Sequence, residues 1–197
     1  MTQTRRAEPD EVEELGRLLG RSFQDDPLLV HMLPDPEQRE QLGAANFEPV
    51  VRLAMQTGEV WRHGGSVACW QPPGKHHPTE DEVRSARLDQ VASVLGEDAV
   101  GRLGAVFAFL DERLQANQVP DHWYLSLLGT EPELKGQGHG ARVLQPVMTK
   151  AAEQGVPCYL ETLAERNVAF YTRQGFALIE AGVEPGSELP YWLFLTS

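Results

Sequence analysis

The chain has 197 residues, which is enough for one domain with a sizeable hydrophobic core. Its formal net charge of -12 argues against a nucleic-acid partner, because the phosphate backbone attracts basic proteins. No apolar run approaches the roughly 18 residues of a membrane span and no signal peptide is visible, so we expect no membrane partner. Cys69 and Cys158 each lie in an apolar run and are expected to be buried free thiols, which predicts a reducing, cytoplasmic location.

Charged residues are unevenly spread along the chain. Residues 135–173 carry a net charge of +2, so the remainder carries -14. This distribution suits an anionic ligand at the basic segment and a cationic ligand elsewhere, although an uneven solvated surface explains it equally well.

The N-terminal half begins with a weak, polar strand at residues 2–7. Apolar residues then recur at helical spacing over residues 8–24 and again over 37–55, which predicts two helices. Two short apolar strands follow, with a Gly-Gly turn that indicates a hairpin: 60–61 and 67–70.

His76 and His77 follow this hairpin in a polar loop. Two adjacent histidines suggest a metal, but no carboxylate or cysteine lies at ligand spacing. We therefore expect both side chains to face solvent and predict no metal site.

The C-terminal half alternates strands and helices. An insertion with two helical patterns, about residues 79–117, precedes the central strand, which is expected at 124–128. The remaining predicted elements are a helix at 141–154, a strand at 157–163, a short helix at 167–174, and two strands at 176–183 and 190–195. This order predicts a single domain, 1–197, with a mixed α/β sheet of about seven strands flanked by helices.

Three glycines, Gly136, Gly138 and Gly140, occupy alternate positions between the central strand and the helix that follows it. Glycine lets backbone N–H groups approach an anion without interference from a Cβ atom. A helix start adds unpaired N–H donors and the positive end of the helix dipole. The turn therefore predicts a site for phosphate or pyrophosphate.

Two other phosphate motifs fit less well. The Gly-x4-Gly-Lys-Ser/Thr sequence of a P-loop is absent. The letters of a dinucleotide fingerprint are present at Gly136, Gly138 and Ala141, with Glu161 near the place of the ribose-binding acid. However, residues 130–135 separate the strand from the first glycine, and too few residues follow Glu161 to complete a doubly wound sheet.

Two segments resemble the signatures of the GCN5-related N-acetyltransferases, the GNAT family. Residues 135–140 lie on the family's pyrophosphate loop, Gln/Arg-x-x-Gly-x-Gly/Ala, with Lys135 where glutamine or arginine is usual. Lysine keeps the positive charge but loses planar hydrogen bonding. Residues 167–176 are similar to the second signature, with one residue fewer before the tyrosine. Within the family, the most similar members are puromycin N-acetyltransferase-like, on the segments 58–61, 67–70, 155–162 and 166–167.

The resemblance implies a central twisted sheet and acetyl-CoA as the cofactor. The pyrophosphate would bind the N–H groups of residues 137–141, and the pantetheine arm would add as a strand beside residues 127–129, where an N–H group near Leu127 or Leu128 would hold the developing oxyanion. Asn167 would cap the short helix while also touching the cofactor, or would serve only as the cap. The implied cofactor-binding residues are Leu127, Leu128, Gly129, Lys135, Gly136, Gln137, Gly138, His139, Gly140, Ala141, Asn167, Phe170, Tyr171 and Arg173.

Tyr171 is similar to the family's general acid, since a phenol is protonated at neutral pH and can donate to a leaving thiolate. The alternative is a core aromatic residue. Glu161 lies mid-strand, so burial could raise its pKa and make it a base. An ion pair with Arg166, or the orientation of a water molecule, is equally open.

The acceptor pocket is expected to combine acidic residues for an ammonium group with aromatic rings for an apolar body. Asp26 is instead expected to end the first helix as a turn residue. The predicted pocket residues are Phe23, Asp25, Trp61, Trp70 and Tyr124.

These observations predict transfer of acetyl from acetyl-CoA to a primary amine of a small molecule, by direct attack in a ternary complex, because no cysteine occupies a nucleophile position beside the glycine turn. One alternative is acetylation of a protein N-terminus or lysine. Another is a non-catalytic module that binds acyl-CoA. The chain is expected to be a monomer or a homodimer.

Overall fold

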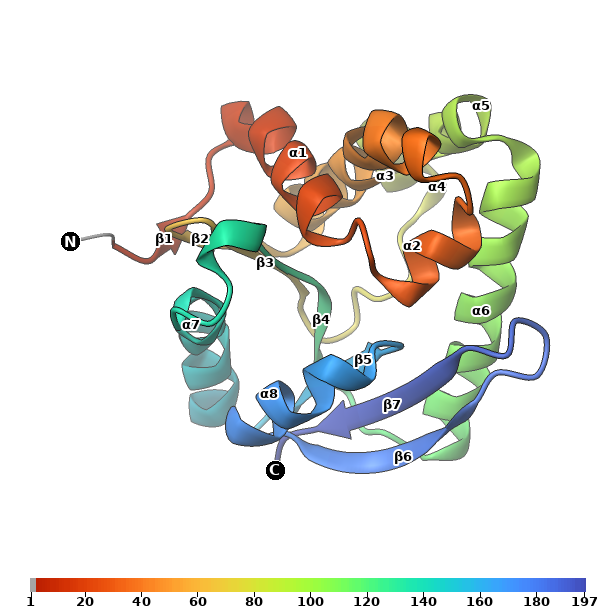
Figure 1. The fold of residues 1–197 in the computed structure, drawn as a ribbon. Helices are drawn as coiled ribbons and strands as arrows, with labels where there is room; N and C mark the ends of the chain where they lie inside the picture. Colours follow the sequence, from red (N-terminus) through yellow and green to blue (C-terminus); the bar gives the residue numbers. More distant parts are fainter. Residues whose placement is uncertain (1–2) are drawn as a thin grey trace.

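The computed structural model describes residues 3–197, which form a seven-stranded sheet in the order β1-β2-β3-β4-β5-β7-β6 (Figure 1). Neighbouring strands are antiparallel except β4 and β5, which are parallel. This confirms the predicted mixed α/β sheet. The strands are β1 (Arg5–Arg6), β2 (Glu59–His63), β3 (Ser66–Gln71), β4 (Trp123–Thr130), β5 (Cys158–Thr162), β6 (Ala177–Val183) and β7 (Pro190–Leu195).

Eight α-helices lie among the described residues and cover both faces of the sheet. Alternate residues of β3 point to opposite faces, so Val67 and Cys69 pack under α1 and α3, whereas Ala68 and Trp70 pack under α7. The helices are α1 (Val12–Ser22), α2 (Pro27–Met32), α3 (Pro36–Thr57), α4 (Glu80–Ala86), α5 (Val91–Leu95), α6 (Glu97–Ala116), α7 (His139–Gln154) and α8 (Val168–Arg173).

The insertion contains three α-helices rather than the two predicted. Arg87 adopts a left-handed conformation with φ of 64° and ends α4. The long helix α6 then runs beside β6 and β7 and buries Val106 and Leu110 against Leu193 and Tyr191 (Figure 1). The last helix of the insertion, α6, therefore covers one face of the sheet at β5 and β7.

The two halves of the sheet separate at its centre. β4 pairs with β5 only at Trp123 and Tyr124. Just beyond this pairing, Ser126 is an extra residue opposite β3, because the register passes from Leu125 to Leu127 between consecutive β3 residues. Such a bulge bends a strand and increases its twist. The C-terminal part of β4 thus has no pairing with β5, and its β5-facing edge is available.

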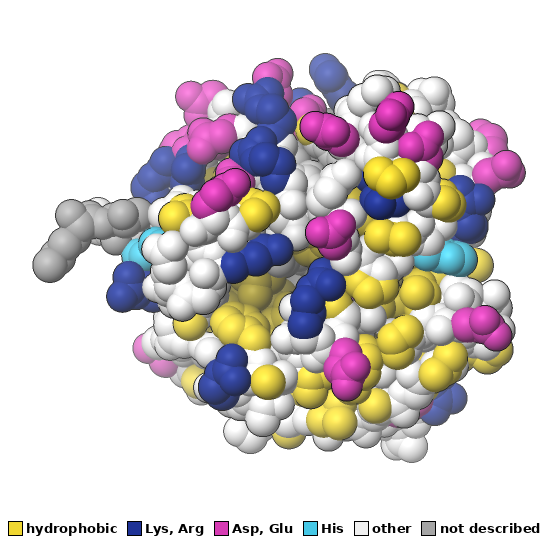
Figure 2. All heavy atoms as spheres, in the orientation of Figure 1, with side chains coloured by type: hydrophobic (Ala, Val, Ile, Leu, Met, Phe, Trp, Pro, Cys, Tyr) yellow, Lys and Arg dark blue, Asp and Glu magenta, His cyan; other side chains and the backbone are white. Residues whose placement is uncertain are grey.

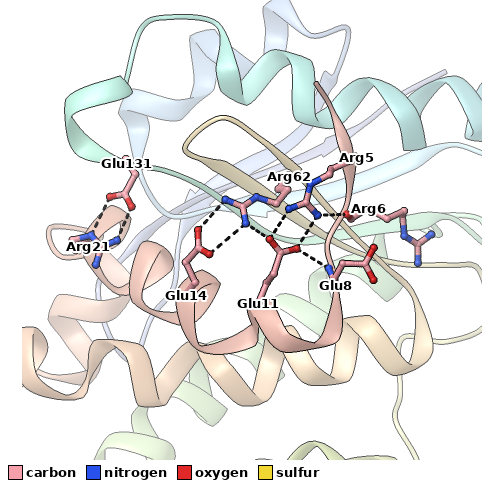
Figure 3. Close-up of polar contacts among 8 residues, drawn as sticks. All are labelled: Arg5, Arg6, Glu8, Glu11, Glu14, Arg21, Arg62 and Glu131. Atoms are coloured by element: carbon pink, nitrogen blue, oxygen red, sulfur yellow. Dashed lines mark hydrogen bonds and ion pairs between the residues drawn. The ribbon is translucent and has the colours of Figure 1, made fainter. Parts of the chain in front are cut away.

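Ion pairs attach α1 to the strands and to the loop after β4 (Figure 3). Arg62 of β2 contacts Glu11 and lies 2.9 Å from the Glu14 carboxylate. Arg21, at the end of α1, lies 2.6 Å from Glu131, which directly follows β4. Exposed pairs contribute little singly, but together they hold α1 beside the start of the glycine turn.

Cys69 and Cys158 are buried and free, as predicted, and burial raises the pKa of each thiol to about 12. No helix in residues 3–197 is long and apolar enough to cross a bilayer.

Candidate active site

A cleft of about 480 Å³ opens where α7 begins, between the end of α1, the end of β4 and α8. It collects most of the predicted cofactor-binding residues and also Phe23. The predicted residues that line it are Leu128, Lys135, Gly136, Gly138, His139, Gly140, Ala141, Asn167, Phe170, Tyr171 and Arg173.

The glycine turn presents free backbone donors to this cleft. Gly136 and Gly138 have φ values of 80° and 82°, a conformation that favours glycine. Gly138 is the N-cap of α7, no side chain of the described residues caps this helix start, and the first bond runs from Arg142 N to Gly138 O at 3.2 Å. The N–H groups of the first helical residues are therefore unpaired, as an anion site requires.

The cleft is positively charged. Of the described residues that line it, three are basic, Lys135, Arg166 and Arg173, and one is acidic, Asp26. Figure 2 shows a hollow on this face with apolar side chains on its floor and Lys and Arg side chains around it. A basic rim, unpaired helix N–H groups and an apolar floor fit a ligand with a diphosphate and an uncharged arm.

Tyr171 of α8 forms part of the inner wall of the cleft and is 7% exposed. Its ring packs against Phe176 and Phe194, with centroids 5.9 Å away from each. Burial raises the pKa of the phenol, and the negative charges of Asp26 and Glu161 raise it further. The hydroxyl therefore keeps its proton at neutral pH and is available as a donor. This packing agrees with the alternative of a core aromatic residue, and the general-acid role of Tyr171 stays a prediction.

A second cavity, of about 340 Å³, lies between β4, β5 and α6. Glu161 faces it and accepts a hydrogen bond from the Tyr124 hydroxyl. Burial raises the pKa of Glu161 to about 7, although that hydrogen bond favours the ionised form. The alternative of an ion pair between Glu161 and Arg166 is not observed, because Arg166 instead lies 4.0 Å from Asp26.

Several predicted pocket residues lie elsewhere. Trp70 has no exposed surface and packs beneath α7, so its assignment to an acceptor pocket is wrong. Trp61 lines neither cavity and donates its indole N–H to Glu59. Asp25 is exposed, and Asp26 lines the cleft in its place.

Asp26 also has the turn role that the sequence predicted. Its carboxylate accepts the Leu28 N–H at 3.0 Å and caps α2. Burial raises its pKa. The same residue also lines the cleft, which the turn role alone did not predict.

Three predicted cofactor residues do not line the cleft. Leu127 packs in the core on the α1 side, and Gly129 is buried so closely that a Cβ atom would lie 2.7 Å from Leu19. The Gln137 side chain bonds back to Glu133 O at 3.1 Å. Asn167 occupies the N-cap position of α8 without capping it, and donates to Thr162 Oγ1 at 3.1 Å instead.

The sequence interpretation missed the histidines of the second cavity. His76 is half-buried rather than solvent-facing, and its ring stacks on that of His122 with centroids 4.2 Å apart. His77, Asp111 and Tyr159 also line the cavity. His76 and His122 lie far apart in the chain, so no local motif announced their contact.

Comparisons with known proteins identify the family. The model described as the acetyltransferase (GNAT) family matches residues 67–176, which is more than half of the chain. The chain therefore belongs to the GNAT acetyltransferase family. An uncharacterized N-acetyltransferase of Schizosaccharomyces pombe is 23% identical over 180 residues, covering 87% of this chain and 73% of that protein.

Two solved structures share the fold over nearly their whole length. One, from Corynebacterium glutamicum, is described as histone acetyltransferase HPA2 and related acetyltransferase; it is 19% identical, with a TM-score of 0.67 over 99% of this chain and 95% of that chain. The other is a polyamine N-acetyltransferase of Drosophila melanogaster, 15% identical, with a TM-score of 0.62 over 99% of both chains. These likenesses establish the GNAT fold.

Proposed function

We propose that this protein is a single-domain enzyme that transfers acetyl from acetyl-CoA to a primary amine of a small molecule. The observation that carries the proposal is the pair of oppositely charged cavities beside the separated strands β4 and β5. The basic cleft contains Tyr171, and the second cavity contains Glu161. Their charges interact, since ionised Glu161 raises the pKa of Tyr171.

The residues of the cleft fit acetyl-CoA, which would supply the acetyl group as a thioester. The unpaired N–H groups at the start of α7 would hold its diphosphate, with Lys135 and Arg173 beside them. The free edge of β4 offers backbone groups to the amides of an extended arm. Phe170 and Leu128 supply apolar contacts along the way.

Glu161 and Tyr171 would then move the two protons of the reaction. Glu161, with a pKa of about 7, takes a proton from the acceptor ammonium and leaves a neutral amine with a lone pair for attack. Tyr171 donates its proton to the sulfur that departs, and its raised pKa keeps that proton in place until then. We propose that the amine attacks the thioester directly, without an acetyl-cysteine intermediate. Cys69 and Cys158 are buried, have raised pKa values and line neither cavity, so neither thiol is placed as a nucleophile.

A small-molecule acceptor is favoured over a protein by the size of the second cavity. A volume of about 340 Å³ is in the range of small-ligand pockets. The Drosophila protein of the same fold is described as forming N-acetylagmatine, which is a small amine product. Puromycin is one candidate acceptor to test, because four segments of the sequence are similar to puromycin N-acetyltransferase-like members of the family.

The test is an acceptor screen that detects free coenzyme A thiol. We expect release of thiol with at least one amine, and no release when the amine is omitted. Failure of every amine would refute the proposal and favour a non-catalytic acyl-CoA-binding module.

The variant Tyr171→Phe separates the roles further. It is expected to lower kcat at least about 100-fold, while calorimetry shows coenzyme A binding within about twofold of wild type. Tyr191→Phe is the matched control, because Tyr191 is equally buried and lines neither cavity. Equal activity of the two variants would contradict the role of Tyr171.

A further inference from the structure

The second cavity contains a buried imidazole whose hydrogen-bonding state follows from its neighbours. His122 is 4% exposed, and its Nδ1 lies 2.8 Å from Pro120 O. A carbonyl oxygen only accepts, so Nδ1 carries the hydrogen. Burial lowers the pKa of His122, and the ring is neutral at pH 7. Its Nε2 therefore offers a lone pair, and no described residue donates a hydrogen bond to it.

His76 presents a second lone pair by the same reasoning. Its Nε2 donates to the backbone oxygen of His122 at 3.0 Å. Burial lowers its pKa, so this ring is also neutral and its Nδ1 is an acceptor. The parallel stack of the two rings, 24° from coplanar, is consistent with two uncharged imidazoles.

The carboxylates of the cavity are also acceptors. Glu161 lies on β5, and Asp111 lies on α6. Asp111 accepts one hydrogen bond from Gln115 at 2.9 Å and forms no ion pair with the described residues. Arg113, which lies on the same helix, is already paired with Glu180 at 2.7 Å. Within residues 3–197, no Lys or Arg lines this cavity.

A ligand that fills this cavity must therefore present N–H donors both to Glu161 and to the acceptors at Asp111 and His122. A monoamine that presents its nitrogen to Glu161 would leave the His122 lone pair without a donor and the Asp111 carboxylate without a cationic partner, and desolvating them in that state is costly. A second cationic nitrogen would satisfy them, and the aromatic rings of Tyr159 and the histidines would surround it.

We propose that the acceptor is a diamine: one nitrogen is acetylated beside Glu161, and a second cationic nitrogen is held by Asp111 and the lone pairs of His122 and His76. This inference rests on the proposed function for the turnover that it predicts. The occupancy of the cavity by a dication is a separate claim that binding alone can test.

The probes are the α,ω-diaminoalkanes from 1,3-diaminopropane to 1,8-diaminooctane, each paired with the n-alkylamine of the same carbon number. At the best length, the diamine is expected to bind at least about 10-fold more tightly in calorimetry with coenzyme A present, the size of one hydrogen-bonded charge. In the thiol assay its kcat/KM should exceed that of the monoamine by a similar factor. The histidine Cε1–H resonances of His76 and His122 should shift with the diamine.

The variant Asp111→Asn should reduce the ratio of diamine to monoamine affinity to near one. Glu112→Gln is the matched control, because it removes the same charge at the next position of α6 from an exposed side chain that lines no cavity. Its ratio should stay at the wild-type value, and near-identical far-UV spectra would show that both variants are folded.

Equal affinity for diamine and monoamine in the wild type would overturn the inference, even if amines are acetylated. Preferential diamine binding that is lost in Asp111→Asn, without turnover of any amine, would support the inference and refute the proposed function. An equal decrease of the diamine-to-monoamine affinity ratio in Asp111→Asn and Glu112→Gln would refute the specific role of Asp111. Such a result would show only a long-range electrostatic effect of negative charge on α6.

Discussion

The clearest quantitative prediction concerns the stability effect of the buried carboxyl Glu161. Its pKa is raised from 4.5 to about 7, so the folded state holds the proton more tightly than the unfolded state. Below pH 4.5 Glu161 is protonated in both states and does not reduce the free energy of unfolding. The stability that comes from the more tightly held proton is lost as the pH rises through about 7. At about 1.4 kcal/mol for each tenfold change in proton affinity, the shift from 4.5 to about 7 means that ionised Glu161 destabilises the fold by at most about 3.4 kcal/mol at pH 8.5.

Replacing Glu161 by Gln removes the charge and keeps an oxygen that can accept from the Tyr124 hydroxyl. We expect Glu161→Gln to be about 1 to 3 kcal/mol more stable than wild type at pH 8.5 and nearly equal to it at pH 4. Urea unfolding at the two pH values measures this difference, provided that the slope is the same for both proteins. The same variant should lose most of its acetyl transfer, because the base is gone.

A carboxylate with the opposite shift provides the control. The pKa of Glu180 is lowered to about 2, first by its hydrogen bond with Arg113, so its ionised form stabilises the fold above pH 4.5. Glu180→Gln should therefore destabilise the protein at pH 8.5. A stability difference between Glu161→Gln and wild type that does not change with pH, or one of the opposite sign, would refute the assignment of a desolvated carboxyl.

The remaining predictions use activity and backbone conformation. The kcat/KM for the acceptor should rise about tenfold for each pH unit below about 7 and level off above it, as Glu161 ionises; a flat profile from pH 5.5 to 8 would exclude Glu161 as the base. Gly138→Ala should cost about 1 kcal/mol or more in unfolding free energy and weaken coenzyme A binding, because φ of 82° is unfavourable for alanine. Gly104→Ala, at an exposed position inside α6 where a Cβ meets nothing, should instead stabilise by about 0.5 to 1 kcal/mol and leave coenzyme A binding unchanged; the opposite order of the two variants would contradict the conformational argument.

Most of the strands were predictable because their signals are local. Apolar runs bounded by glycine and proline placed β6 and β7 within about one residue of their observed ends. The start of α7 was likewise predictable from the glycine turn, because the three alternate glycines lie within six consecutive residues and form a local signal. The break at Arg87 was not predictable, because a non-glycine residue there adopts a left-handed conformation that its type does not favour.

The error at Trp70 has a physical cause. Helices cover both faces of β3, and all six of its residues are buried, so no alternation distinguishes a side chain beneath a helix from one beside a cavity. Asp25 and Asp26 differ by one position at the end of α1, where the chain leaves helical periodicity. Which of them faced the cleft was decided by the start of α2, a helix that the sequence pattern did not indicate.

The separation of positive and negative charge into two cavities depends on the pleat of β5. The basic segment 135–173 also contains Glu161, whose charge would oppose an anion if it faced the cleft. Leu160 points to the α7 and α8 side of the sheet, so Glu161, the next residue, points with Tyr159 to the α6 side. A shift of one residue in the β5 register would exchange these faces, placing a carboxylate beside the diphosphate site and removing the base from the acceptor cavity. The proposed chemistry therefore depends on strand register as directly as it depends on the glycine turn.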